Sequence, residues 1–401
     1  MRIITEENRG IASLLAFMLI PISGFAMDVY IPSFPRMAAD LGADESAIRL
    51  TMTVYLISYG LSQLFAGSLI DHFGRYRFGL VSLFLFMITN LVIIHSSTIG
   101  LVLVMRAVQG LLISLIMMSK RSLFVDLYEG AKRQHYTSLL SIVWSSAPII
   151  APFLGGYFEA HFGWRANFWF LAGYAAIMFL LELVFSGETL KVRGPLQPKL
   201  VLNAYSFMLT KKDFTLGIVM LGLSYAMVII FNMAIPFIME NRFHFTAVET
   251  GYAALASGLA MLFGGITSRV LLKKDFFRKL LMAVLLLFIT AFIMMLSSGM
   301  QNHILVMMAF VILLHFLQGF LYNVYFTYLL TRFPQYAGMS GGITSGGAYL
   351  VTSVASYAIA GFLSIDDQQT LSASYLILSL LLGGIVMLLK FSGVFRQPAA
   401  I

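Results

Sequence analysis

Three ionisable residues lie well inside the long apolar stretches of this chain: Asp28, Arg106 and Glu182. A charged side chain is costly in such a stretch, so each is a candidate functional group. Burial favours the neutral form of a carboxyl group, whereas an arginine stays charged. We therefore expect Asp28 to take up and release a proton in response to a substrate or to Arg106. A static ion pair is the alternative for Asp28, and anchoring of a helix is the alternative for Arg106.

The residues that follow Asp28 decide how deep it lies. Pro32 and Pro35 either end the first helix or kink it. If they kink it, the helix continues toward Leu41 and Asp28 lies near the middle of a membrane span. Glu182 stands near the end of a predicted helix, where it can reach lipid headgroups, so a structural role is favoured for it.

Other polar side chains on apolar helices are candidates for proton coupling or substrate contact. His315 can titrate in mid-span, which makes it a second proton-coupling candidate. Aromatic and amide groups suit amphipathic ligands of varied shape. The candidate substrate contacts are Tyr30, Tyr59, Gln109, Tyr225, Asn232, Tyr322 and Asn323. Packing in the helix core is the alternative for each of them.

Several kinds of chemistry are excluded by residue type. The chain has no cysteine, which excludes disulfides, iron–sulfur clusters and cysteine nucleophiles. It has neither a Gly-x-x-x-x-Gly-Lys-Ser/Thr loop nor a His-Glu-x-x-His motif, so we expect no direct use of ATP and no zinc-peptidase site. No metal site or cofactor is expected. A membrane-embedded enzyme and a channel or receptor-like scaffold are the rivals from other classes.

The composition shows what must position these side chains. Of the 401 residues, 59% are hydrophobic and 11% are charged, and the mean hydropathy is +0.88. Soluble domains carry about a quarter charged residues. A water-soluble fold, a disordered chain and a nucleic-acid-binding domain are therefore excluded, although the net charge of +8 alone would suggest nucleic acid.

Apolar runs long enough to cross a bilayer recur along the chain and predict an all-α membrane protein. Division at turns and charge clusters gives twelve helices: 10–40, 46–70, 77–95, 98–120, 135–159, 165–186, 213–240, 246–270, 278–297, 302–331, 337–364 and 369–391. The first stretch is longer than a signal-peptide core and contains Asp28, so we expect it to be retained as a span.

Basic residues predict the orientation of these spans. With the N-terminus inside, all but five of the 26 Lys and Arg residues fall in cytoplasmic segments. The exceptions are Arg36, Arg165 and Arg242 in outer loops and Arg49 and Arg106 within helices. Cytoplasmic loops carry such an excess, so both termini are expected in the cytoplasm.

The longest hydrophilic stretch divides the chain into near-equal halves. We expect a six-helix bundle at 1–187, a cytoplasmic linker at 188–212 and a second six-helix bundle at 213–401. Residues 200–209 of the linker could form an amphipathic helix on the membrane surface. The halves share a weak repeat, since Arg106-x-x-Gln109-Gly110 recurs as His315-x-x-Gln318-Gly319. Internal repeats with a site at the midplane are typical of secondary transporters.

Four segments resemble motifs of one transporter family. Residues 67–77, Gly-Ser-Leu-Ile-Asp-His-Phe-Gly-Arg-Tyr-Arg, look like the signature loop between helices two and three of the major facilitator superfamily. Residues 106–110 resemble the helix-four motif of its proton-coupled members, and residues 151–156 resemble the helix-five motif of its antiporters. Residues 28–32 look like the drug-efflux branch that includes bicyclomycin and chloramphenicol exporters, the Bcr/CflA type.

The resemblance implies a two-bundle fold and roles for particular residues. Arg106 would take part in proton coupling. Asp71, Gly74 and Arg75 would form a conformational latch between the halves on the cytoplasmic side. Pro152, Gly155 and Gly156 would let helix five pack closely and bend.

The sequence thus predicts a multi-pass, monomeric secondary transporter of the cytoplasmic (inner) membrane that exchanges protons for small amphipathic compounds. The proton gradient would supply the energy, and the partners would be the substrate, protons and the lipid bilayer, with no nucleic acid. The main alternative keeps the fold but changes the cargo to one metabolite, such as a siderophore or an amino-acid derivative, exported or taken up.

Overall fold

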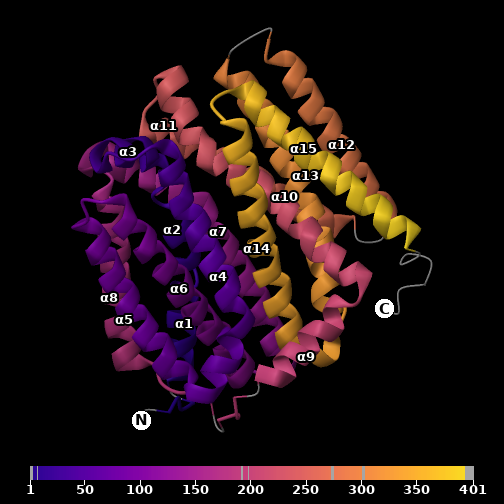
Figure 1. Ribbon diagram of the computed structural model, residues 1–401. Coiled ribbons are helices and arrows are strands. Elements are labelled where there is room, and N and C mark those ends of the chain that lie inside the picture. Colours follow the sequence, from indigo (N-terminus) through magenta and orange to yellow (C-terminus); the bar gives the residue numbers. More distant parts are fainter. Residues whose placement is uncertain are drawn as a thin grey trace. The chain divides into compact units, whose positions relative to one another are not determined.

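The chain is all-helical in its computed structural model (Figure 1). The structure describes residues 3–6, 8–190, 193–196, 198–271, 275–299 and 303–392, except for the side chains of residues 138, 141, 142, 145 and 337. Two compact units are present, Met1–Leu200 and Val201–Ile401. The finer division at 187/188 and 212/213 stays a prediction.

The N-terminal unit is drawn in indigo to magenta in Figure 1. Its helices are α1 (Arg9–Leu19), α2 (Ile22–Asp28), the 3-10 turn η1 (Ile31–Ser33), α3 (Phe34–Leu41), α4 (Glu45–Phe73), α5 (Arg75–Ile94), α6 (Ile99–Leu127), α7 (Gly130–Phe162) and α8 (Arg165–Phe185). Helix α6 packs against α4 and α5, α5 also packs against α8, and α2 packs against α7.

The C-terminal unit repeats this packing. The helix α9 (Pro198–Leu209) covers the predicted amphipathic segment; it is followed by α10 (Lys212–Phe237), the π turn η2 (Ile238–Arg242), α11 (Ala247–Val270), α12 (Phe276–Ser297), α13 (Ile304–Thr331), η3 (Pro334–Tyr336), α14 (Ala337–Leu363) and α15 (Gln368–Phe391). Helix α13 packs against α11 and α12, α12 also packs against α15, and α10 packs against α14. The weak sequence repeat therefore corresponds to a repeated set of helix contacts.

Eleven helical segments of the described chain are long and apolar enough to cross a membrane. They match the predicted spans closely, and the chain from Arg9 to Leu41 counts as one of them. The remaining predicted span, 135–159, falls within the 33-residue helix α7, which is not among the eleven. The predicted end of the fourth helix at residue 120 is wrong, because α6 continues to Leu127.

The first span is built from pieces rather than from one helix. Proline has no backbone N–H to donate, and Pro21 follows the last residues of α1 while Pro32 lies in the turn η1. The chain nevertheless continues through α3 to Leu41 as one span, which agrees with the alternative in which the span goes on beyond the prolines. Helix α2 ends at Asp28, which places this carboxyl group at the interruption.

Candidate functional site

Arg106 of α6 lies between two aromatic rings. Its guanidinium carbon is 4.4 Å from the ring centroid of Tyr30 and 4.3 Å from that of Tyr55, which come from the first span and from α4. Arg106 itself is fully buried. A cation held over aromatic faces is stabilised by their quadrupoles, and more strongly where water is excluded. The three helices thus hold one positive charge in a defined place.

Hydrogen bonds continue from Arg106 into α5. Arg106 Nη1 donates to the carbonyl oxygen of Ala26 and to Gln109 Oε1, each at 2.8 Å. Gln109 Nε2 donates to Asn90 Oδ1 at 3.1 Å, and Asn90 donates to the carbonyl oxygen of Phe86. Gln109 is buried and its side chain is bonded to Arg106 and Asn90 within the unit. Its role as a substrate contact stays a prediction.

Asp28 is buried without a bonding partner. Asp28 is 1% exposed, and neither of its carboxylate oxygens makes a hydrogen bond to the described part of the chain. Arg106 Nε and Nη2 are likewise buried and unbonded. The positive charge of Arg106 acts on the Asp28 carboxyl group, but no ion pair within 4.0 Å joins them. A buried charge without a partner is costly, and the proton-coupling role of Asp28 and Arg106 stays a prediction.

The other predicted aromatic contacts of this unit line the same region. The Tyr30 hydroxyl group lies 3.0 Å from Thr51 Oγ1, and the ring of Tyr59 stacks on that of Tyr55 with centroids 6.0 Å apart. Tyr55 is not among the predicted site residues, and its ring is one of the two on Arg106. The substrate role of Tyr30 and Tyr59 stays a prediction.

Helix α7 packs closely against the chain around Asp28. A Cβ atom on Gly155 would lie 1.5 Å from the carbonyl oxygen of Val29, so only glycine fits at this position. Pro148 of α7 lies against Gly24 of α2 in the same way, and Pro152 is buried inside α7. Gly155 of the helix-five motif therefore brings α7 into contact with the residue after the candidate proton carrier. For Gly156 no contact of this kind is described.

The predicted latch residues meet at the start of α5. Arg75 Nε donates to Asp71 Oδ1 at 2.9 Å, and Arg75 Nη1 donates to Asp126 at the end of α6. Asp126 was missed in the sequence because the predicted helix stopped before it. All these partners belong to the N-terminal unit, so the structure describes a cluster within one unit, and its role as a latch stays a prediction.

Glu188 completes this cluster and was also missed. Its carboxylate accepts hydrogen bonds from the backbone N–H groups of Arg75 and Tyr76 at the first turn of α5, where negative charge is favoured. Gly74 has φ of +103°, and a Cβ atom there would lie 2.8 Å from Glu188 Oε2. Glu188, three residues after the end of α8, thus fixes the turn between α4 and α5.

Glu182 corrects one expectation. It does not reach the headgroups: it is 2% exposed, and its Oε2 accepts a hydrogen bond from Lys120 Nζ at 2.6 Å. Lys120 was assigned to a cytoplasmic segment but lies inside α6, where this buried ion pair compensates its charge. The structural role favoured for Glu182 stays a prediction, and the ion pair supports it.

In the C-terminal unit His315 has neutral partners. His315 Nδ1 lies 2.6 Å from Ser257 Oγ of α11, and Nε2 lies 3.2 Å from the hydroxyl group of Tyr375 of α15. The ring of Phe231 packs edge-on against it at 5.2 Å. No carboxylate contacts this fully buried histidine among the described residues. Its proton-coupling role stays a prediction.

Two of the remaining substrate candidates lie together. The rings of Tyr225 on α10 and Tyr322 on α13 are 6.0 Å apart. Asn323 faces α11, because its amide nitrogen would lie 2.9 Å from a Cβ atom on Gly265. Asn232 is buried on α10 two turns after Tyr225.

An ion pair that was not predicted joins the start of α10 to the residue after α13. Arg332, just after α13, donates to Asp213 Oδ2 at 2.7 Å, and the hydroxyl group of Tyr328 donates to the same oxygen. The hydrogen bond to Asp213 raises the pKa of Arg332 above its usual value.

Known proteins resemble the chain in sequence and in fold. Multidrug resistance protein D of Escherichia coli K12 is 35% identical over 39% of this chain and 40% of its own length. Multidrug resistance protein MdtL of Escherichia coli O157:H7 is 28% identical over 61% of this chain and 63% of its own length. The chain thus spans less than two thirds of the length of each of these relatives.

Two solved structures share the fold at low sequence identity. The human organic anion transporter MFSD10 has a TM-score of 0.67 and 17% identity, covering 96% of this chain and all of its own. A D-xylose-proton symporter has a TM-score of 0.72 and 14% identity, covering 92% and 96%. Residues 16–356 match the sequence profile of the Major Facilitator Superfamily. The chain therefore belongs to the major facilitator superfamily, a family of membrane transporters rather than of enzymes, and it is a multi-pass protein of the inner membrane.

Proposed function

We propose that the chain is a proton-coupled antiporter that exports small amphipathic compounds by alternating access. The observation that carries this proposal is the buried carboxyl group of Asp28, unbonded, at the interruption of the first span, in the field of the buried Arg106. The energy source would be the proton gradient, with no cofactor, and the transporter would act as a monomer.

The coupling step follows from the charges of this site. With Asp28 ionised, its negative charge offsets the positive charge of Arg106. With Asp28 protonated, Arg106 is left uncompensated between Tyr30 and Tyr55. Proton binding and the binding of a cationic or polar substrate group would therefore compete for one carboxyl group, which is the thermodynamic basis of exchange.

The packing around Asp28 would allow that competition to change the conformation of the unit. The carboxyl group stands where α2 ends, and α7 touches the next residue at Gly155. Interrupted helices with ion sites at the break are common in secondary transporters. A change in charge at Asp28 would therefore act directly on the contact between α2 and α7.

The topology proposed for this cycle has twelve spans, with α7 as the fifth, and both termini in the cytoplasm. The Lys and Arg residues concentrated between predicted spans support it. The Asp71–Arg75–Asp126 cluster would then lie on the cytoplasmic side and stabilise one conformation of the cycle.

The proposed cargo follows from the side chains and from the relatives. Aromatic residues such as Tyr225 and Tyr322, with the nearby amides, suit amphipathic molecules. Two relatives are named multidrug resistance proteins, and the motif at Asp28 supports the Bcr/CflA branch. A permease for a single metabolite is the outcome to be distinguished by experiment.

The test is transport by the purified full-length protein in proteoliposomes, with and without an imposed pH gradient. Ethidium and chloramphenicol serve as probes, and a pH-sensitive dye in the lumen reports proton movement. Asp28→Asn should abolish gradient-driven transport and proton movement, whereas Asp28→Glu keeps a carboxyl group and should retain part of both. Gradient-driven transport at the parental rate in Asp28→Asn would reject the coupling role. Proton movement elicited by neither probe in the parent protein would favour the single-metabolite permease.

A further inference from the structure

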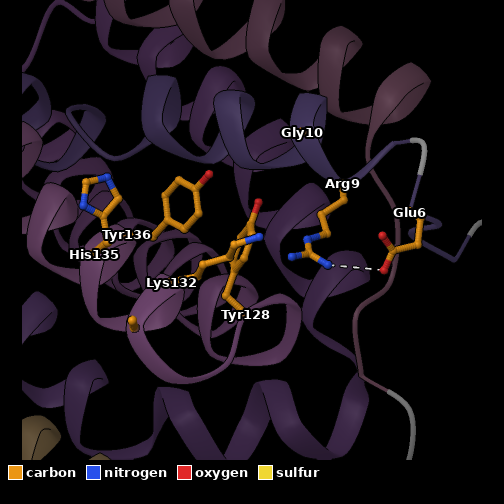
Figure 2. Close-up of a pocket in the computed structure, with 8 residues that line it drawn as sticks. Glu6, Arg9, Gly10, Tyr128, Lys132, His135 and Tyr136 are labelled. Atoms are coloured by element: carbon orange, nitrogen blue, oxygen red, sulfur yellow. Dashed lines mark hydrogen bonds and ion pairs between the residues drawn. The ribbon is translucent and has the colours of Figure 1, made fainter.

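A surface pocket of about 570 Å³ lies at one end of the N-terminal unit, and neither Asp28 nor Arg106 lines it. Figure 2 shows this pocket. It opens between the start of α1 and the junction of α6 with α7. Its walls are formed by Glu6, Arg9, Gly10, Tyr128, Ala131, Lys132, His135 and Tyr136. None of these residues takes part in the proposed transport cycle.

The floor of the pocket is aromatic and fixed. The rings of Tyr128 and Tyr136 lie 4.3 Å apart, and Figure 2 shows both between Arg9 on one side and His135 on the other. The Tyr128 hydroxyl group is bonded to Ser13 Oγ at 2.8 Å. Burial raises the pKa of Tyr128, but its hydrogen bonds and the Arg9 charge outweigh burial and lower it overall. The aromatic floor thus lies beside the positive charge of Arg9.

The basic side chains around this floor are available to a ligand. Arg9 lies over the Tyr128 ring at 4.3 Å and pairs at 3.3 Å with Glu6, whose side chain is 93% exposed. Such an exposed pair is weak, so an anion can displace Glu6. Lys132 is exposed and makes no hydrogen bond or ion pair with the part of the chain that the structure describes. Two such cations lining one pocket suit a phosphate, since arginine binds it through two N–H groups and lysine as a point charge.

The position of the pocket along the helices indicates which kind of phosphate-bearing ligand it can meet. One membrane-crossing segment begins at Arg9 and another ends at Leu127, so the pocket lies where spans emerge from the hydrocarbon region. Lipid headgroups occupy this level, and aromatic rings beside basic residues are characteristic of it.

We propose that this α1–α7 pocket binds a phosphate-bearing anion, either the headgroup of an anionic lipid or a free phosphate ester. Arg9 and Lys132 hold the phosphate, and Tyr128 and Tyr136 support the adjoining glycerol or organic group. An occupied pocket joins the start of α1 to the start of α7. This binding is independent of the proposed direction of transport and of its cargo.

The test measures binding to the full-length protein in detergent by native mass spectrometry and by thermal unfolding. Dioctanoyl phosphatidylglycerol is the lipid probe, dioctanoyl phosphatidylcholine the uncharged-headgroup control, and glycerol 3-phosphate the free-anion probe. The parent protein should bind one phosphatidylglycerol saturably. Lys132→Gln should weaken this about fivefold, and Lys132→Gln with Arg9→Gln on the order of thirtyfold.

The matched control is Arg133→Gln, which removes the same charge one residue further along α7 without touching the pocket. It should leave the dissociation constant unchanged. Tighter binding of phosphatidylglycerol than of glycerol 3-phosphate identifies a lipid site, and equal binding identifies a free-anion site. Equal weakening by Arg133→Gln and Lys132→Gln would overturn the pocket in favour of diffuse attraction. Absence of saturable binding by either anionic probe would also overturn it.

Discussion

Gly110 of α6 and Gly319 of α13 occupy the same place in the two units and do the same structural work. A Cβ atom on Gly110 would lie 2.4 Å from the backbone oxygen of Tyr55 on α4, and one on Gly319 would lie 2.2 Å from that of Met261 on α11. In lipid, where burial of apolar surface does not drive helices together, such close approach provides the packing. The shared Gln-Gly pair of the sequence repeat thus marks a shared helix crossing.

The two units differ at the residue one turn before this glycine, which is Arg106 in α6 and His315 in α13. Arg106 is charged, lies between two tyrosine rings, and shares its surroundings with the unbonded carboxyl group of Asp28. His315 is held by the hydroxyl groups of Ser257 and Tyr375, and no acidic group contacts it in the described part of the unit. The two glutamines differ as well, because Gln109 bonds to Arg106 while both side-chain polar atoms of Gln318 are buried without a partner.

The comparison teaches that the scaffold is repeated while the chemistry is not. The equivalent helix contacts need only small residues at the crossings, so they can be kept in both units. Buried charges are expensive, and among the described residues most of them lie in the N-terminal unit, whereas the C-terminal unit has Asp213 and Lys279, close to the starts of α10 and α12. We therefore expect coupling to depend on the Arg106 region, and the His315 region to serve mainly structure.

The largest expected difference concerns Arg106→Gln and His315→Gln. Arg106→Gln leaves the Asp28 carboxyl group buried without an opposite charge. Since the proposed exchange depends on the charge of Arg106 acting on Asp28, gradient-driven transport should fall about a hundredfold, which corresponds to about 3 kcal/mol. His315→Gln removes no charge partner and should reduce it far less. Flux in proteoliposomes under an imposed pH gradient measures both. Equal losses would end the distinction between the two units.

The next effect tests the shared scaffold. Gly110→Ala and Gly319→Ala each force a methyl group against backbone atoms and should each lower the free energy of unfolding by about 1–3 kcal/mol. Gly100→Ala is the control on α6, because a Cβ atom there meets nothing within 4 Å. Thermal unfolding in detergent, followed by helical circular dichroism, measures all three. A destabilisation in only one of the two tight positions would show that the crossings are not equivalent.

A smaller effect is expected at the ion clusters near the helix ends. Asp71 is about half exposed and shares Arg75 with the more buried Asp126. Asp71→Asn should leave the protein inserted and lower turnover about twofold to fivefold, and Asp126→Asn should lower it more. Since the chain has no native cysteine, the single variant Ser122→Cys beside Arg75 reports opening of the cluster by maleimide labelling.

The control for this labelling lies in the other unit. Asp213→Asn breaks the ion pair with Arg332 and should leave labelling of Ser122→Cys unchanged. Unchanged transport and unchanged labelling in both Asp71→Asn and Asp126→Asn would remove the latch role from the Arg75 cluster.

Hydropathy predicted the helices well because each span must satisfy its backbone internally and remain apolar for its whole length. The prediction went wrong where charge was taken as the end of a span. Lys120 suggested a loop, but its ion pair with Glu182, 62 residues later in the chain, keeps it inside α6. Asp126 was missed for the same reason.

The sequence predicted the charged residues of the site, but it did not predict the residues that bond to the candidate side chains. Asp28 and Arg106 stand out in a single sequence because charges are rare in spans. Ser257 and Tyr375 do not, since such residues are common in helices and only the tertiary fold brings them to His315, across 58 and 60 residues of chain. Glu188 looked like part of a solvated linker, and only the positive φ of Gly74 and the N-terminus of α5 give it a role.

The smallest expected effects come from removing one buried hydroxyl group in each unit. Tyr375→Phe keeps the ring beside His315 but removes the hydroxyl group next to Nε2, and Tyr30→Phe keeps the ring on Arg106 but ends the contact with Thr51. Each should lower the free energy of unfolding by about 1 kcal/mol, the usual net value of a hydrogen bond. Transport should change less than about twofold in either, because neither variant changes a charge or the packing on Arg106. Thermal unfolding and gradient-driven flux measure the pair side by side. If Tyr375→Phe instead abolished gradient-driven transport while Tyr30→Phe did not, the proton would have to pass through His315, and the assignment of chemistry to the N-terminal unit and of structure to the C-terminal unit would be reversed.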